Sequence, residues 1–294
     1  MAQNFASLRK NRNSLDRLVQ ESQKLNTQAT TNKNKDERFW QPTVDKAGNG
    51  FAVIRFLPEP KSEDLPWVRV FSHGFQGPGG WYIENSLTTI GQKDPCGELN
   101  THLWNNGTDA GKEQARKQKR RLQYISNIYV VKDSGNPDND GKVFLYKYGK
   151  KIFDKINEAM TPAFEDEKPI NPFDFYGGAD FKLKIRKVEG YRNYDKSEFD
   201  SPSKFLDGDD DGLEEIWNTQ HGLLEFVDSK QFKSYPELET RLMRVLGVNG
   251  FGASPKHDTV EDAVEETPVL REAEPATIDE EDNLSFFEKL AEED

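Results

Sequence analysis

The sequence predicts a mainly β protein with inserted helices, built as a small barrel or a partly open sheet with long loop insertions. Short runs of β-branched and aromatic residues, bounded by Gly and Pro, recur through the middle of the chain. One further stretch alternates apolar and basic residues with the period of a strand. Helical spacing of apolar residues is confined to a few short segments. Helices are therefore expected as insertions into a sheet.

The first predicted elements are strands. Residues 51–57 and 67–71 are predicted strands, and residues 74–111 are predicted to be rich in loops. Residues 124–132 and 142–148 flank a turn cluster of Gly, Asn and Asp. That arrangement predicts a β-hairpin.

Three helices and one more strand are predicted after the hairpin. Apolar residues recur at helical spacing at Ile152, Phe153, Ile156 and Met160. Residues 181–188 alternate as in a strand with one solvated face, and an acidic turn precedes a short helix at 213–217. Ser234 and Glu237 match a capping box, which predicts a final helix that ends at Gly247.

Charge is distributed unevenly along the chain. Residues 258–294 carry fifteen Asp and Glu against two Lys and Arg, whereas the whole chain has a net charge of −12. The body of the protein is therefore almost neutral. Such a tail either competes with phosphate for basic surfaces of a nucleic-acid-binding protein, or only keeps the protein soluble. Both interpretations stay open on composition alone.

The first 35 residues form a predicted basic arm, with seven Lys and Arg against two Asp and Glu. Leu15, Leu18 and Val19 suit one face of a short helix, and a flexible stretch rich in Asn and Thr follows. An arm of this kind is typical of a partner-binding or phosphate-binding appendage, and it could equally dock on a neighbouring copy. The chain thus divides into a basic arm (1–35), a core (36–250) and an acidic tail (251–294) that is expected to be disordered.

Composition also limits the function classes. Cys96 is the single cysteine, so no intrachain disulfide is possible and a reducing compartment is expected. No apolar run approaches the roughly 18 residues that span a bilayer, and the N-terminus lacks a signal-peptide core. The sequence contains neither a nucleophile elbow nor a GxxxxGK[ST] phosphate loop. We expect a soluble, intracellular protein that is not an enzyme.

Basic residues alternate with tyrosines in three places. Residues 112–121 hold six cations ahead of Tyr124, residues 142–151 read KVFLYKYGKK, and residues 182–194 repeat the pattern. On a strand, Tyr146 and Tyr148 point to one face of the sheet. Aromatic rings flanked by cations are typical of sites that bind unpaired nucleic-acid strands.

The alternative is that these tyrosines are core or half-buried strand residues and the lysines a solvated face, since strands favour aromatic residues. Three clusters with the same interleaving favour the binding interpretation. Leu145, Ile185 and Ile128 are expected to be better core candidates than the tyrosines.

Six runs of residues carry a resemblance to a known family. In chain order they are AGNGFAVIRFLP, SHGF, GGWYIE, SNIYVVKD, GKVFLYKYGKKIFDKIN and NYDKSEF. Together they resemble the single-stranded DNA-binding proteins of T-even-type bacteriophages over residues 36–250. The resemblance implies an OB-fold core with long loop insertions, a basic arm for cooperative self-association, and an acidic tail that recruits replication proteins.

The resemblance also implies which residues bind. The base-contacting aromatic positions of the family match Tyr124, Tyr146, Tyr191 and Tyr194, and Tyr148 matches a further aromatic position. The complete set expected to contact DNA is Lys119, Arg120, Arg121, Tyr124, Tyr146, Lys147, Tyr148, Lys150, Lys151, Tyr191 and Tyr194. Self-association is assigned to Arg9, Lys10 and Arg12, in a basic cluster that is interrupted compared with the family. The terminal residues Leu284, Phe286, Phe287 and Leu290 are expected to anchor the tail in a groove of a partner.

The family carries a zinc ion bound by one His and three Cys, and this sequence departs from that pattern. His73 and Cys96 match two ligand positions, but the other two hold Ser86 and Leu99. A structural zinc site requires four good donors. The zinc is therefore expected to be absent, even if His102 is considered as a substitute ligand. The region is expected to be held instead by apolar packing, with contributions from Trp81, Ile83, Leu99 and Trp104.

The sequence therefore predicts a non-catalytic protein that coats single-stranded DNA cooperatively and with little sequence preference. The resemblance places it in phage DNA replication, recombination and repair, in the cytoplasm of the infected bacterial host. Its expected partners are single-stranded DNA, further copies of itself, and phage replication and recombination proteins. The alternatives are an RNA-binding or protein-interaction adaptor on an OB-like scaffold, or an accessory subunit of an enzyme.

Overall fold

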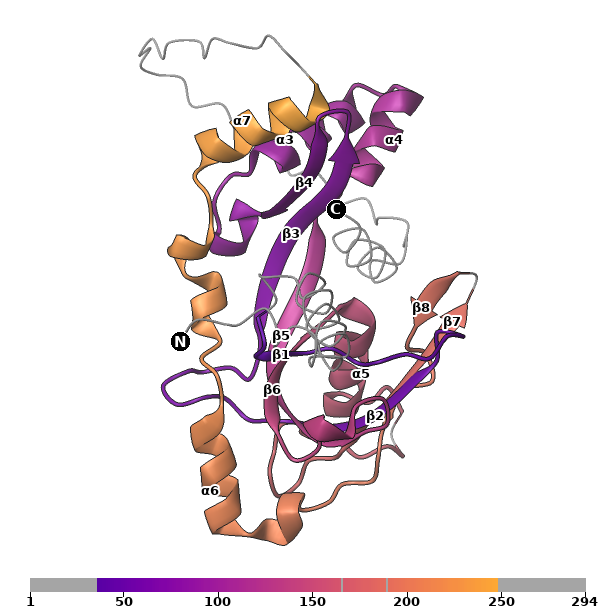
Figure 1. Cartoon of the computed structure of the whole chain (residues 1–294), viewed down its shortest axis with the longest axis vertical. Helices are drawn as coiled ribbons and strands as arrows, with labels where there is room; N and C mark the ends of the chain where they lie inside the picture. Colours follow the sequence, from indigo (N-terminus) through magenta and orange to yellow (C-terminus); the bar gives the residue numbers. More distant parts are fainter. Residues whose placement is uncertain (1–35, 165, 189, 248–294) are drawn as a thin grey trace, which may run out of the picture.

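The computed structural model describes residues 36–164, 166–188 and 190–247 (Figure 1). They form a mixed open sheet with several helices, so the mainly β class with inserted helices is confirmed. The strands are β1 (Phe39–Trp40), β2 (Gly50–Phe56), β3 (Val68–Gly77), β4 (Gly80–Asn85), β5 (Arg121–Asp133), β6 (Val143–Tyr148), β7 (Phe181–Val188), β8 (Tyr191–Asn193) and β9 (Glu198–Phe199). The α-helices are α3 (Pro95–Asn105), α4 (Asp109–Lys117), α5 (Lys150–Met160), α6 (Asp210–Thr219) and α7 (Tyr235–Leu246). Short 3-10 helices are η1 (Leu87–Ile90), η2 (Pro137–Asn139), η3 (Phe205–Gly208), η4 (Leu224–Val227) and η5 (Ser229–Gln231).

The sheet is organised around β5, its longest strand. The strand order is β1-β6-β5-β2-β7-β8, and β3 also pairs with β5 and carries β4. The β1–β6 pair is parallel, whereas the others are antiparallel. The predicted strands at 51–57, 67–71 and 181–188 are confirmed. The predicted hairpin is also confirmed, and it consists of β5 and β6.

The two faces of β6 belong to different cores. Tyr146 and Tyr148 pack into the main core with Phe56 and the buried face of α5. Leu145, on the opposite face of the strand, packs instead with Val68 and neighbouring aliphatic residues. The strand alternation expected from the sequence is therefore confirmed, and both faces of the strand are covered.

The stretch 74–111 was expected to be rich in loops, and this prediction is wrong. It contains the end of β3, all of β4, η1 and α3, and the first residues of α4. The missed helix start is Asp94, whose carboxylate accepts a hydrogen bond from Gly97 N at 3.0 Å while Pro95 occupies the first helical turn. Asp followed by Pro is a recognised helix start, because both residues suit the unpaired N–H groups there.

A second core joins these elements to α7, and we call β4, α3, α4, α7 and the end of β3 the α3–α7 lobe (Figure 1). Ile83 and Trp104, which were expected to pack inside it, are about half exposed, at 51% and 48%. Leu99 does pack against this core. The buried residues are Phe75, Tyr82, Leu87, Cys96, Leu238, Leu242 and Val245. On β4, Tyr82 points into this core, so the adjacent Ile83 points away from it.

Helix α7 begins and ends where the sequence predicted. Ser234 and Glu237 form the capping box, and Gly247 ends the helix with a φ of 69°. The last turn of α7 rests on the β3–β4 turn, where Gly79 N donates to Val245 O at 2.8 Å. A Cβ on Gly79 would lie 2.0 Å from Arg244 O, so only glycine permits this contact.

Several predicted residues lie outside the described residues. They are the arm residues Arg9, Lys10 and Arg12 and the tail residues Leu284, Phe286, Phe287 and Leu290. Within the described ranges, none of the helices is both long and apolar enough to cross a membrane.

Candidate nucleic-acid interface

Four aromatic rings form a column between the β5–β6 hairpin and α5. Tyr124 and Tyr148 are directly paired in register, and their rings stack with centroids 5.8 Å apart and planes at 17°. Tyr146 extends the column on one side, 5.4 Å from Tyr148. Phe153, from the first turns of α5, closes the other side 3.8 Å from Tyr124, with planes at 8°. The sequence placed Phe153 on a helix face, but nothing in the spacing indicated that it stacks on a tyrosine.

The tyrosines of this column are buried. Leu145 is fully buried, as expected of a core residue, but Tyr124, Tyr146 and Tyr148 are buried as well, with only 5%, 3% and 4% of their surface exposed. The physical reason is that their rings fill the space under α5 by stacking on one another. The Tyr148 hydroxyl lies 2.9 Å from Ser126 Oγ, and burial raises the pKa of Tyr148. The Tyr124 ring thus stacks with aromatic rings from both β6 and α5.

The two remaining tyrosines lie on and beyond the β7–β8 hairpin. Tyr191 begins β8 and is 54% exposed. Tyr194 is half-buried against the main core. Tyr191 thus differs from the buried tyrosines of the column, because most of its surface faces solvent and its ring is available for stacking with another planar group.

The first group of predicted cations lies where α4 ends and β5 begins. Lys119 and Arg120 are exposed, and the Arg120 guanidinium lies 4.3 Å from the centroid of the Phe71 ring. Arg121 Nη2 donates to Gly74 O at 2.9 Å, which ties β5 to β3. Arg121 therefore has a structural role in addition to its charge.

The second group of cations gathers at the start of α5. Lys150 and Lys151 are its first two residues, and Gly149 before them supplies no capping side chain. The first turn contains no acidic residue, although the positive end of the helix dipole favours anions there. Lys150 pairs with Asp154 one turn on at 2.6 Å, and Lys147 Nζ lies 4.9 Å from the centroid of the Phe39 ring. Two lysines at an uncapped helix N-terminus are well suited to hold a phosphate.

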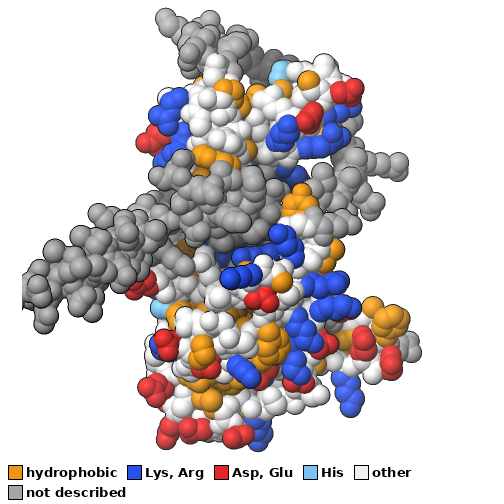
Figure 2. All heavy atoms as spheres, turned by 45° about the vertical axis from the view of Figure 1, so that its right-hand side comes forward, with side chains coloured by type: hydrophobic (Ala, Val, Ile, Leu, Met, Phe, Trp, Pro, Cys, Tyr) orange, Lys and Arg blue, Asp and Glu red, His pale blue; other side chains and the backbone are white. Residues whose placement is uncertain are grey.

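The third basic cluster, on β7, contributes little net charge. Three of its cations are each matched by a carboxylate from residues 195–200: Lys182 with Asp200 and Lys184 with Glu198, both at 2.6 Å, and Arg186 with Asp195. This corrects the view of that strand as a basic surface. Exposed cations also lie at the end of α4 and at the start of α5, and Figure 2 shows Lys and Arg side chains gathered on one face of the molecule.

The residues at the zinc positions of the resembling family form a different kind of site. Asp94 carboxylate oxygens lie 3.1 Å from His73 Nε2 and 3.0 Å from Ser86 Oγ, and one also accepts from Leu87 N at 3.1 Å. All of these side chains are buried. Sequence reasoning missed Asp94, whose only signal was its place before Pro95.

This network leaves no donor set for a metal. His73 Nδ1 lies 3.1 Å from Gln118 O and Nε2 faces Asp94, so both ring nitrogens approach oxygen acceptors. Cys96 Sγ also faces Gln118 O, at 3.8 Å, and burial raises the pKa of this thiol, which opposes the thiolate that a metal requires. Among the described residues, no group of three His, Cys, Asp or Glu could hold a metal ion. The residues present do not fit zinc.

Comparisons with known proteins find several relatives of this chain. The family model described as "gp32 DNA binding protein like" matches residues 48–246. The chain is 38% identical over 234 residues to the single-stranded DNA-binding protein of Enterobacteria phage T2, covering 77% of this chain and 78% of that protein. The same values hold for the single-stranded DNA-binding protein of Enterobacteria phage T4. A shorter match, 48% over 61 residues, covers 21% of this chain and 54% of the single-stranded DNA-binding protein of Escherichia phage SV14.

Proposed function

Because the chain belongs to the gp32-like family of DNA-binding proteins, we propose that it binds single-stranded DNA and acts without catalysis. The observation that carries this proposal is the cationic, uncapped start of α5 beside a column of aromatic rings. A backbone phosphate at this helix end would be held by Lys150 and Lys151 together with the helix dipole. The names of the relatives support DNA over the RNA-binding alternative.

Binding would combine charge along the backbone with stacking at the bases. Lys119 and Arg120 extend the cationic surface from α5 toward the α3–α7 lobe. Tyr191 would stack a base on its exposed ring. The buried tyrosines of the column would set the shape of the surface and offer ring edges to the strand, because their faces already contact one another.

The remaining features of the proposal concern scaffold, metal and partners. We propose that the strands around β5 correspond to an OB-fold, and that the α3–α7 lobe is stable without zinc. Residues 9–12 would mediate self-association, so that copies bind cooperatively along the strand. The acidic tail would recruit replication and recombination proteins in the cytoplasm of the infected host.

A salt titration tests the central proposal. The logarithm of the affinity for oligo-dT is expected to fall linearly with the logarithm of salt concentration, with a slope of about −0.7 per phosphate contacted. Duplex DNA of the same length should bind more weakly, because its bases are already stacked. Fluorescence anisotropy with oligo-dT, oligo-U and duplex measures all three. Equal affinity for duplex and oligo-dT would contradict the proposal, and a clear preference for oligo-U would favour the RNA-binding alternative.

Replacing Tyr191 by alanine tests the stacking contact. Its ring is largely exposed, so Tyr191→Ala should weaken binding to a short oligo-dT by about 1–3 kcal/mol, the range for one base stacked on an aromatic ring. The melting temperature should stay unchanged. Tyr176→Ala is the matched control, because Tyr176 is equally exposed at 54% but its hydroxyl donates to the carboxylate of Asp210 at 2.6 Å, in an acidic part of the chain. If both variants bind as the wild type does, Tyr191 does not contact a base.

A further inference from the structure

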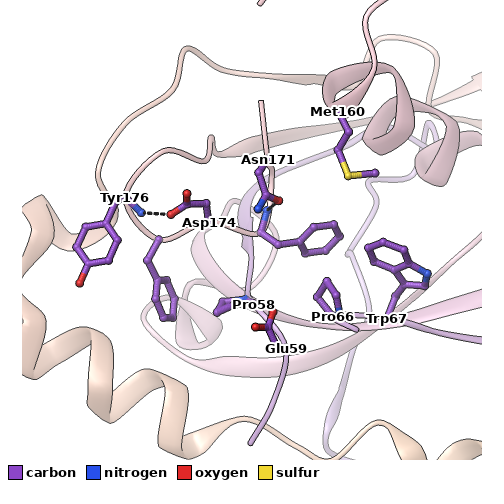
Figure 3. A pocket seen from close by; sticks show the side chains of 10 residues that line it. Pro58, Glu59, Pro66, Trp67, Met160, Asn171, Asp174 and Tyr176 are labelled. Atoms are coloured by element: carbon purple, nitrogen blue, oxygen red, sulfur yellow. Dashed lines mark hydrogen bonds between the residues drawn. The ribbon is translucent and has the colours of Figure 1, made fainter. Parts of the chain in front are cut away.

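A pocket of 480 Å³ lies at the end of the main core that is formed by the β2–β3 connection (Figure 3). Its walls are largely apolar and come from three segments: Pro58, Pro66 and Trp67 from that connection, Met160 from the end of α5, and Phe173 and Tyr176 from the chain before β7. Glu59 and Asp174 add two carboxylates to the lining. The pocket therefore offers an apolar floor and negative charge in one place.

The surroundings of the pocket are acidic. Residues 58–66, 166–176 and 206–217 together contain twelve Asp and Glu against two Lys. Two contacts bring the last of these segments to the rim: the Tyr176 hydroxyl donates to Asp210 Oδ1 at 2.6 Å, and Trp217 Nε1 donates to Glu59 O at 2.9 Å. A ligand that enters this pocket therefore meets a strong negative potential, which favours a cation.

The walls are fixed by a buried arginine. Arg55 is fully buried, and its guanidinium donates to Asp174 O at 2.9 Å and to Ser203 O at 3.0 Å. It also lies 3.4 Å from Asp180 Oδ1. Phe173 packs against Trp67 with ring centroids 5.2 Å apart. The pocket is thus preformed, so a ligand need not order its walls on binding.

The chain itself contains a segment with the complementary chemistry. Residues 1–35 carry seven Lys and Arg against two Asp and Glu, and Phe5 and Leu8 lie next to the basic cluster at 9–12. The acidic tail, by contrast, would be repelled by the rim. Thirty-five residues can extend to at most about 120 Å, which is enough to reach a neighbouring molecule.

We propose that this pocket binds the basic arm, residues 1–35, of a second copy of the chain. Apolar arm residues would enter between Trp67, Met160 and Tyr176, while Arg9, Lys10 and Arg12 would face Glu59 and the acidic rim. Because the pocket and the arm are different surfaces, each copy can offer both at once, and the contact can continue from copy to copy. The proposal names the surface that the proposed self-association would use, and it rests on that part of the proposed function.

The first test uses a fluorescent peptide of residues 1–35 and the full-length protein. Wild-type protein is expected to bind the peptide with an affinity that falls as salt rises. Glu59→Lys should weaken this binding at least fivefold, because it reverses a charge at the pocket without touching the main core. Glu239→Lys is the matched control, since Glu239 is an exposed residue of α7 in the other lobe. Equal affinities for the Glu59→Lys and Glu239→Lys proteins would overturn the proposal.

The second test separates this proposal from DNA binding itself. Affinity is measured for an oligo-dT of about 8 nucleotides, which accommodates one copy, and for one of about 40 nucleotides, which accommodates several. Glu59→Lys and Tyr176→Ala should lower affinity for the long strand several-fold and leave the short strand unchanged. Loss on neither strand, or the same loss on both, would overturn the pocket as the docking site. Wild-type protein that fails to bind either strand would instead contradict the proposed function.

Chemical cross-linking gives a readout that does not depend on affinity. Cys96 is the one cysteine of the sequence, and it is buried. A short bismaleimide should therefore react with the cysteines that Arg9→Cys and Glu59→Cys introduce. A mixture of the two variants should form more mixed dimers than a mixture of Arg9→Cys with Glu239→Cys. Equal yields from the two mixtures would contradict the contact.

Discussion

Replacing Asp94 by alanine is expected to lower the free energy of unfolding by about 2–4 kcal/mol, because a helix N-cap and the acceptor for several buried polar groups are lost together. The substitution leaves His73 and Ser86 buried without their carboxylate and removes the N-cap of α3. The α3–α7 lobe should open first, because Asp94 joins β3, η1 and α3. Urea denaturation followed by circular dichroism measures the loss.

Asp94→Asn is the matched variant. Asparagine is also a good N-cap, so it should retain the contact with Gly97 while losing the charge that faces His73. An intermediate loss of stability is therefore expected. Chelators such as EDTA should change neither protein. A zinc content of one ion per chain, or an Asp94→Ala protein within about 0.5 kcal/mol of the wild type, would contradict the metal-free network.

The same network makes the lobe sensitive to acid. Burial of Asp94 opposes its charged form, but contact with His73 and hydrogen bonds from Gly97 and Ser86 outweigh burial and lower the pKa of Asp94 to about 2. An aspartate in the unfolded chain has a pKa of about 3.9. Because the folded value is the lower one, the stabilisation is complete above about pH 4 and is lost as the pH falls toward 2, a change of about 2–3 kcal/mol.

Replacing Tyr146 by alanine is expected to destabilise the main core by about 3–5 kcal/mol, the range for truncating a buried aromatic residue. Its ring stacks on Tyr148 and meets Trp40 edge-on at 5.2 Å, so its removal leaves a cavity between β1 and β6. DNA binding should weaken as a consequence of unfolding. Thermal unfolding and oligo-dT titration on the same preparations distinguish the two effects.

Tyr191→Ala is the comparison for this variant, because the same substitution at an exposed ring should reduce binding and leave stability alone. Tyr146→Phe keeps the ring and should keep the core. If the Tyr146→Ala protein melts at the wild-type temperature but binds DNA more weakly, the Tyr146 ring contacts a base directly and does not stabilise the core.

The sequence predicted elements well where pattern and local chemistry agree. The β5–β6 hairpin has alternating residues around a turn cluster, and α7 has a capping box and a terminal glycine. Family resemblance pointed to the same tyrosine-rich hairpin as a candidate binding site, which stays a prediction. None of these signals depends on which segments meet in space, which is why a single sequence sufficed for them.

Burial of the tyrosines could not be predicted in the same way. Whether the face that carries Tyr146 is open depends on α5, which returns over the hairpin and places Phe153 against Tyr124. The Asp94 network has the same origin, since His73, Ser86 and Asp94 meet only after β3, η1 and α3 pack together. Side chains that are separated in sequence and joined by tertiary packing leave no periodic signal.

The acidic segments around the pocket and the cations at the start of α5 belong to different elements of the fold, and a separation of charge has a kinetic consequence. A body whose two signs of charge are segregated has a large electric dipole, so the field of an approaching polyanion exerts a torque on it. The molecule would rotate before contact, with its positive side leading. Productive collisions would then be more frequent than its negative net charge suggests, and this gain in encounter rate would fade at high ionic strength.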